Sequence, residues 1–334
     1  MSAGSDPAPP GPPDGAAGDL RADPDVPAGI RYDPDLAVHE PMATGTEPVA
    51  PGRRRSPLVL FAGGLLGLSA VIYALFGLIA RETRTSADYL NEVRIGRGDA
   101  WRAAYELSRM IPEEDPRRRD PATARQVISL LEEARDQDAR LRRYLVLALG
   151  ELRDPSAGEP LAQALADADA ETRIYAAWGL AALGERRAAP AVAPLLEDSD
   201  PGVRKMGAYA LGVLGDASQA APLLAALNDP VDEVAWNAAL ALARTGHRGG
   251  LPLLGRILDR GYLDARTRAD DAGRPVPIDE DRKVDLLINT LRAIALLDDR
   301  SHLEAVRVLS VSDPSPRVRQ AAIETLERID PTSR

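Results

Sequence analysis

The chain has 334 residues and no cysteine, which excludes disulfides, thiolate nucleophiles and zinc sites with cysteine ligands. Hydrophobic residues make up 45% of it and aromatic residues only 4%, so Ala, Leu, Val and Ile dominate, as is typical of helical proteins. The net charge is -10, and the part after residue 84 contributes about -7, the wrong sign for a surface that binds phosphates.

Residues 1–52 are rich in Pro, Gly, Ala and Asp and have almost no aliphatic clusters. Such a segment buries too little apolar surface to offset the entropy lost on ordering, which predicts a disordered tail. Basic residues throughout the chain are Arg apart from Lys205 and Lys283. Together with the many Ala and Pro residues, this bias indicates a GC-rich bacterial source.

An uncharged apolar stretch runs from Leu58 to Ala80, inside a basic and apolar region at 53–81. As a helix it would be about 35 Å long, enough for one tilted crossing of a hydrocarbon core about 30 Å thick. A cleaved signal peptide is the competing interpretation, but the long preceding tail and the length of the run favour an uncleaved signal anchor. The sequence therefore predicts a single transmembrane helix at 58–80.

The flanks of this stretch bear on its orientation. Arg53, Arg54 and Arg55 precede it, whereas Arg81 and Arg84 follow it with Glu82 between them. This excess favours a cytoplasmic N-terminus, with the large domain on the periplasmic side of the membrane. The spacing of Gly63 and Gly67 within the stretch also occurs in helix dimers, although glycine is common in membrane spans.

A repeat begins after residue 138. Four similar stretches start at 141, 172, 203 and 234, a constant spacing of 31 residues with no insertion. In the third stretch Val203, Ala210, Leu211 and Leu214 form one apolar stripe of a helix, which ends at Gly215. A second apolar stretch, Pro222 to Leu227, follows it, so each unit is predicted to be a pair of helices.

An aspartate column, Asp167, Asp198 and Asp229, falls in the turns between units. We expect these carboxylates to accept hydrogen bonds from free amides at the next helix start and to pair with Arg173 and Arg204 of neighbouring units. A catalytic role is the alternative. The regular spacing favours a structural role.

The segment from Asp200 to Asp216, with Val203-Arg204 and Ala210-Leu211-Gly212 in it, resembles the HEAT repeat of the phycobilisome-lyase subtype. The resemblance covers roughly residues 138–260 and returns at Asp313 to Glu327. It implies an all-α fold, an α-solenoid of helical hairpins, whose second helices usually line a concave binding face. The predicted architecture is such a solenoid at 85–334, preceded by the transmembrane helix and the disordered tail.

The flanking regions depart from the period. A degenerate first repeat is expected from near Asp88, followed by an insertion near 112–121. The distance from Val234 to the next unit, near Lys283, exceeds one period by 18 residues, and the surplus at 261–281 is expected to form a loop. Because such insertions often lie on the binding side, the candidate partner-binding residues are Tyr262, Arg266, Arg268, Asp270 and Asp271.

Stacked hairpins create an extended surface with no deep central cavity, which favours a protein partner over a small-molecule substrate. The chain has three histidines, and the paired His-Glu motifs of HEAT-type metal hydroxylases are missing from its repeats, so neither a metal nor a cofactor is expected. Nucleic-acid binding is not expected either. The hypothesis is a membrane-anchored scaffold or adaptor without enzymatic activity, and the alternative is a lyase-like or regulatory protein that acts on a modified partner.

Overall fold

The computed structural model describes residues 84–96, 99–117, 120–269 and 273–330. The chain divides into two compact units, residues 1–77 and 78–334, and all the described residues belong to the second. The predicted tail at 1–52 and the predicted span at 58–80 lie outside the described residues, as do Asp270 and Asp271. Among the helices that are described, none is both long and apolar enough to cross a membrane.

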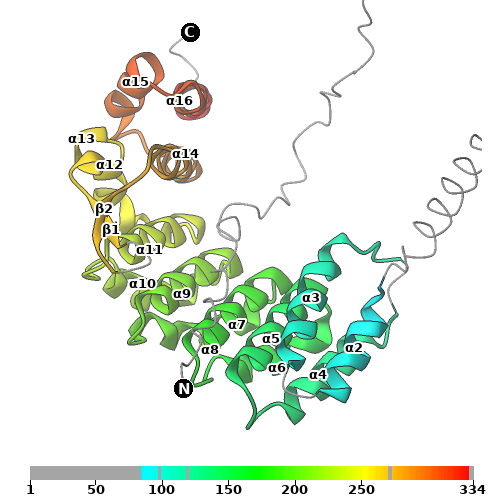
Figure 1. Cartoon of the computed structure of the whole chain (residues 1–334). Helices are drawn as coiled ribbons and strands as arrows, with labels where there is room; N and C mark the ends of the chain where they lie inside the picture. Colours follow the sequence, from blue (N-terminus) through cyan, green and yellow to red (C-terminus); the bar gives the residue numbers. More distant parts are fainter. Residues whose placement is uncertain (1–83, 97–98, 118–119, 270–272, 331–334) are drawn as a thin grey trace, which may run out of the picture. The chain divides into compact units, whose positions relative to one another are not determined.

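Helices dominate the described part of the chain (Figure 1). In chain order the α-helices and strands are α2 (Ser86–Ile95), α3 (Ala100–Met110), α4 (Thr123–Glu133), α5 (Ala139–Leu152), α6 (Gly158–Ala164), α7 (Ala170–Leu183), α8 (Ala189–Val192), α9 (Pro201–Leu214), α10 (Ala220–Ala226), α11 (Asp232–Arg244), α12 (Leu251–Ile257), α13 (Arg260–Asp264), β1 (Thr267–Ala269), β2 (Pro275–Pro277), α14 (Glu280–Leu296), α15 (Leu303–Ser312) and α16 (Pro316–Ile329). Short 3-10 helices join several of them, among them η4 (Ala193–Glu197), which continues α8.

Each 31-residue unit contains a long first helix and a short second helix, as the sequence predicts. The first helices α5, α7, α9 and α11 have 13 or 14 residues, and each packs along the next, with α3 packed on α5 before them (Figure 1). The second helices α6, α10 and α12 have seven residues and pack against first helices. The unit is therefore a hairpin that buries its apolar side only when a neighbour stacks on it.

Glycine ends the first helices, as expected. Gly184, Gly215 and Gly246 have φ angles of +69°, +66° and +78°. These values lie in the left-handed region, which residues with a Cβ rarely adopt. The first unit instead has Arg153 at φ 50°. This sharp end lets the chain reverse within a few residues, so that the second helix folds back onto the first.

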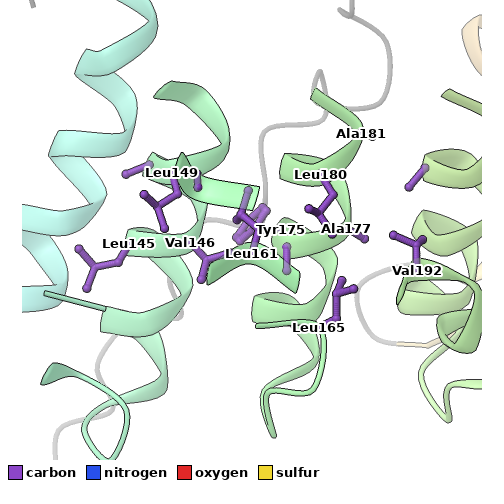
Figure 2. Close-up of a cluster of buried hydrophobic side chains, with 14 of the residues drawn as sticks. Leu145, Val146, Leu149, Leu161, Leu165, Tyr175, Ala177, Leu180, Ala181 and Val192 are labelled. Atoms are coloured by element: carbon purple, nitrogen blue, oxygen red, sulfur yellow. The ribbon is translucent and has the colours of Figure 1, made fainter. Parts of the chain in front are cut away.

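The core between units is built from leucines and small residues. Leu145 and Leu149 of α5 and Leu161 of α6 are fully buried (Figure 2). A Cβ at Gly150 would lie 2.6 Å from the Trp178 ring and 3.0 Å from the Cα of Gly179, so the first helices touch through their backbones at this point. Glycine is required here because any larger residue would separate the helices.

A ladder of ion pairs confirms that the aspartates pair with Arg173 and Arg204, but each pair lies within one 31-residue unit and not between two units. The guanidinium Nε and Nη2 of Arg173 donate to Asp198 at 2.8 and 2.9 Å, and Arg204 binds Asp229 in the same way at 2.7 and 3.1 Å. The structure adds a third pair, Arg142 with Asp167, at 2.7 and 3.0 Å. In every pair the aspartate lies 25 residues after its arginine, directly behind the second helix.

The predicted capping role of the aspartate column needs correction. Asp198 accepts the backbone N–H of Asp200, which is the residue that precedes α9 and not a residue of its first turn. It is Asp200 that accepts from the N–H groups of Gly202 and Val203 and caps the helix. The ladder residues lie two positions too early for that role, and their carboxylates are bound instead by the arginine of the preceding first helix.

Two short antiparallel strands, β1 and β2, lie in the insertion at 261–281, so the predicted all-α fold and the predicted loop are wrong there. The register pairs Arg268 with Val276. Pro275 and Pro277 cannot continue a helix, which gives the chain a local reason to extend. The buried apolar residues form two clusters, one from α2 to α11 and one from α11 to α16, and the insertion belongs to the second.

The regular arginine–aspartate pattern of the ladder is interrupted at this insertion. By the 31-residue period Ala235 stands where the ladder has arginine, and Arg260 stands where it has aspartate. Arg260 pairs instead with the buried Asp313 at 2.6 and 2.8 Å and with Glu280 at 2.5 Å. One side chain from α13 thus links the turn before α16 to the start of α14.

We predict that Arg173→Ala lowers the free energy of unfolding by about 3 kcal/mol. The Asp198 side chain is only 13% exposed, and the substitution removes the arginine that pairs with its carboxylate. Burial raises the pKa of Asp198, but the hydrogen bonds from Arg173 and from the backbone of Asp200 outweigh it and hold the pKa below its ordinary value. Urea unfolding at neutral pH measures the loss. Arg187→Ala, with a side chain that is 90% exposed, is the control, and equal losses for both variants would contradict the ladder's role.

Candidate protein-binding surface

The outer side of the first helices carries most of the aromatic residues in the described chain. We call this surface the first-helix face. Along a helix its residues recur three or four positions apart, and between helices they recur 31 positions apart, as Tyr144 and Tyr175 do, or Trp178 and Tyr209. All three tryptophans of the chain lie on it. The face consists of Trp101, Tyr105, Tyr144, Leu147, Ile174, Tyr175, Trp178, Met206, Tyr209, Trp236 and Leu240.

The N-terminal part of the face is an aromatic cluster bordered by arginines. Trp101 stacks on Tyr144 with ring centroids 6.3 Å apart, and Tyr105 meets the same ring edge-on at 5.0 Å. The guanidinium of Arg140 lies over Trp101 at 4.5 Å, and that of Arg109 over Tyr105 at 5.7 Å. Rings held in this way offer rigid apolar area beside charged groups, which is the composition of binding hot spots.

Charged residues on the face pair across neighbouring helices. Arg143 binds Asp169 at 2.9 Å and Glu171 at 2.6 Å, both from the start of α7. Glu233 lies 3.8 Å from Lys205 and 3.5 Å from Arg282, and so connects α9, α11 and α14. These pairs fix the orientation of long side chains around the aromatic residues. Side chains that are already ordered lose less conformational entropy when a partner binds.

Burial keeps the tyrosines of the face protonated. Burial, together with the nearby Glu171 carboxylate, raises the pKa of Tyr175 to about 12. Burial also raises the pKa of Tyr144 and of Tyr209. At neutral pH their hydroxyl groups are therefore uncharged.

The described insertion residues join the end of this face. Tyr262 is partly buried, and the Nε1 of Trp236 donates to its hydroxyl at 3.4 Å. The guanidinium of Arg266 lies 4.5 Å from the centre of the Tyr262 ring and 3.5 Å from Asp232. Arg268 lies 3.8 Å from Asp279. Tyr262 and Arg266 thus come together beside α11, whereas Arg268 lies in the strand pair and Asp270 and Asp271 are outside the described residues.

The face itself was missed by sequence reasoning, which looked for the binding residues in the insertion and on the second helices. The second helices expose small or scattered polar residues: Glu159, Gln163, Pro190, Ala191, Ala221 and Ala225. The signal that could have identified the face is the alignment of Trp178 with Tyr209 at the 31-residue spacing. Bulky rings at one repeat position are unusual in a chain with 4% aromatic residues.

The two histidines of the solenoid take part in turns. His247 accepts the N–H of Gly249 at 3.0 Å through Nδ1. Nδ1 of His302 lies 2.6 Å from the carboxylate of Asp299, which also accepts from Arg248 and Ser301. Within the described ranges no group of three or more His, Cys, Asp or Glu residues is arranged to hold a metal ion.

Comparison with known families gives a consistent result. Residues 127–193 and 158–243 match the profile of the family described as HEAT repeats, and residues 303–332 match that of a single HEAT repeat. The chain contains HEAT repeats. Together with the packing of the hairpins, these matches establish an α-solenoid of the HEAT and armadillo type.

Solved structures of helical-repeat proteins are also similar. The complex of CpcE and CpcF of phycocyanin lyase from Nostoc sp. PCC7120 matches with 21% identity and a TM-score of 0.48, over 74% of this chain and 95% of that one. YIBA of E. coli matches with 16% identity and a TM-score of 0.46, over 84% and 100%. A designed armadillo repeat protein in complex with the peptide (KR)4 matches with 16% identity and a TM-score of 0.36, over 74% and 100%. No curated protein matches the sequence.

We predict that alkaline pH destabilises the fold through Tyr175. Because its pKa in the folded chain is raised above the value of about 10 for an unfolded tyrosine, its contribution is complete below pH 10 and is lost as the pH rises toward 12. Urea unfolding at pH 8 and pH 11 measures the loss for the natural chain. Tyr175→Phe should show a smaller loss, and an unchanged pH dependence in that variant would contradict the assignment.

Proposed function

We propose that this protein is a membrane-anchored scaffold or adaptor that binds a partner protein through the first-helix face and performs no chemistry of its own. One observation carries the proposal: on the outer side of the first helices the partly exposed rings of Trp101, Tyr105 and Tyr209 lie beneath the guanidinium groups of Arg140, Arg109 and Arg244, whereas the second helices expose small residues. Protein interfaces are enriched in Trp, Tyr and Arg, and their centres are poor in Lys and Glu.

The alternative, a lyase-like or regulatory protein acting on a modified partner, needs ionisable groups that converge on a binding face. The second helices present mainly alanine and proline to solvent, with scattered polar residues such as Glu159. On the first-helix face Arg143 and Glu233 are already engaged in ion pairs. These observations support binding over catalysis.

The anchor is part of the proposal and rests on the sequence at 58–80. A tether confines the solenoid to a layer next to the membrane and raises its effective concentration toward membrane-associated partners. The basic flank before the span favours a solenoid on the periplasmic side. An envelope complex or a transporter is the kind of assembly that such a scaffold would serve.

Affinity capture tests the binding surface. With the detergent-solubilised full-length chain as bait, Trp101→Ala combined with Arg140→Glu should lower recovery of the specific partner at least tenfold, because it removes a stacked ring and reverses the charge above it. Pro190→Ser combined with Ala191→Ser on α8 is the matched control. Equal recovery by both baits, after thermal melting has shown that both fold, would remove the face from consideration.

The insertion is tested in the same assay with a chain that lacks residues 261–281. We expect weaker recovery of the same partner, since Tyr262 covers Trp236 at the end of the face. Identical partner lists for the two forms would exclude Tyr262, Arg266, Arg268, Asp270 and Asp271 as binding residues.

Alkaline carbonate extraction tests the anchor. The full-length chain should stay in the membrane fraction, because moving about 20 apolar residues into water is unfavourable. A chain in which Leu65 and Leu66 are replaced by Arg should be released, since charges near the bilayer centre oppose insertion. Release of the natural chain would overturn the anchor and leave the binding surface untouched.

A further inference from the structure

The last described first helix, α16, lacks the cover that its counterparts have. Arg319 and Arg173 hold equivalent positions, because each donates Nη1 to the carbonyls five and six residues before it. By this equivalence Ile323 corresponds to Ala177, and by the period to Val146, Ala208 and Ala239. Those four residues are completely buried, whereas Ile323 is 42% exposed.

In the inner units this position faces the second helix of the same unit. A Cβ on Gly250, just before α12, would lie 3.2 Å from the Cβ of Ala239. No helix within the described residues occupies the equivalent place beside α16. Ile323 is therefore exposed because a second-helix position is empty there.

Two more apolar residues surround this position. Leu326 is partly exposed, although its counterparts Leu149, Leu180, Leu211 and Leu242 are at most 1% exposed. Val311, two residues before Asp313, is 83% exposed, while Leu165 and Leu196 at the same distance from their ladder aspartates are each 7% exposed. We call Val311, Arg319, Ile323 and Leu326 the terminal face. Apolar side chains that lie exposed together on a helical repeat mark a place where a further helix can pack.

Arg319 indicates the chemistry of that partner. Its Nη1 contacts the carbonyl oxygens of Asp313 and Pro314 at 2.6 and 3.1 Å, just as Arg204 contacts those of Asp198 and Ser199. In Arg204 this anchoring aims Nε and Nη2 at a carboxylate directly behind a second helix. Arg319 forms no ion pair with any described carboxylate, so its guanidinium is oriented for one that these residues do not supply.

We propose that the terminal face binds a short amphipathic helix of a partner protein, with leucines along one side and an aspartate directly after its last turn. A helix laid in this way would complete the unit of α16, with the aspartate on Arg319 and the leucines on Ile323 and Leu326. The chain's own α10, with Leu223, Leu227 and Asp229, shows what such a helix looks like.

A second copy of the chain fits this position less well. The first described helix, α2, packs on α3 and α4 as a second helix does, and its outer residues Asp88, Asn91 and Glu92 are polar. The inference does not depend on the first-helix face.

Disulfide capture tests the proposal, and the absence of cysteine from the chain makes it specific. The protein carries Ile323→Cys, or Ala191→Cys on the exposed side of α8 as the control. The probe is a synthetic peptide of residues 217–229 with Cys in place of Gln219, the counterpart of Gly250. Under a fixed ratio of reduced to oxidised thiol, Cys at 323 should capture at least roughly ten times more peptide than Cys at 191.

A charge exchange tests the role of Arg319. Arg319→Glu in the Ile323→Cys protein should lower capture about tenfold, and a peptide with Asp229→Lys should restore it in that protein alone. Trp101→Ala should leave capture unchanged, which separates this site from the first-helix face. Equal capture at 323 and 191, or no response to the charge exchange, would overturn the proposal. Disulfide-linked dimers of the Ile323→Cys protein that Arg319→Glu prevents would assign the face to a second copy instead.

Discussion

The bidentate pairing of an arginine on the first helix with the aspartate behind the second helix of the same unit is the contact on which the inner solenoid depends. A helical hairpin has apolar residues on the side that meets its neighbour, and apolar contacts alone allow one hairpin to slide or rotate against the next. Arg173 removes that freedom, because its two parallel hydrogen bonds to Asp198 fix both distance and direction. The Nη1 of Arg173 also donates to the carbonyls of Asp167 and Ala168 in the turn that ends the preceding unit, so one side chain joins two successive turns to its own helix.

This fixed stacking has a direct effect on the surface. The first helices approach closely through Gly150 and Gly179, which brings the side chains on their outer sides into contact with those of the next helix. Trp101 can therefore stack on Tyr144 of the neighbouring helix, and Arg143 can reach Glu171. A face assembled from several units is rigid because the units are held in fixed positions. A rigid face loses less conformational entropy when a partner binds.

Much of the fold follows from the sequence because a repeat displays the same physical requirement several times. The spacing of 31 residues, the glycine that ends each first helix and the pairing of Arg173 with Asp198 were all predictable. The capping role was assigned to the wrong aspartate, since two acids stand two positions apart in each turn and only geometry separates them. The strand pair was missed because three-residue strands leave no periodic pattern.

The binding surface was harder to predict than the fold. Trp178 and Tyr209 stand at one position of the repeat, but Trp178 is buried and Tyr209 is partly buried, so little of either side chain reaches the surface. A sequence shows which residues share a helix side but not how closely neighbouring helices lie. The rerouting of Arg260 to Asp313 was equally hidden, because 53 residues separate the partners.

The constant offset between the ladder partners also bears on how such a chain can evolve. Since every inner arginine finds its aspartate 25 residues later and the unit has 31 residues, removing or duplicating one whole unit, such as residues 173–203, leaves each remaining arginine with a correctly placed aspartate. One deletion or duplication can thus change the length of the solenoid without breaking any of the remaining arginine–aspartate pairs. The interrupted register at Arg260 marks the one place in the described chain where this freedom ends.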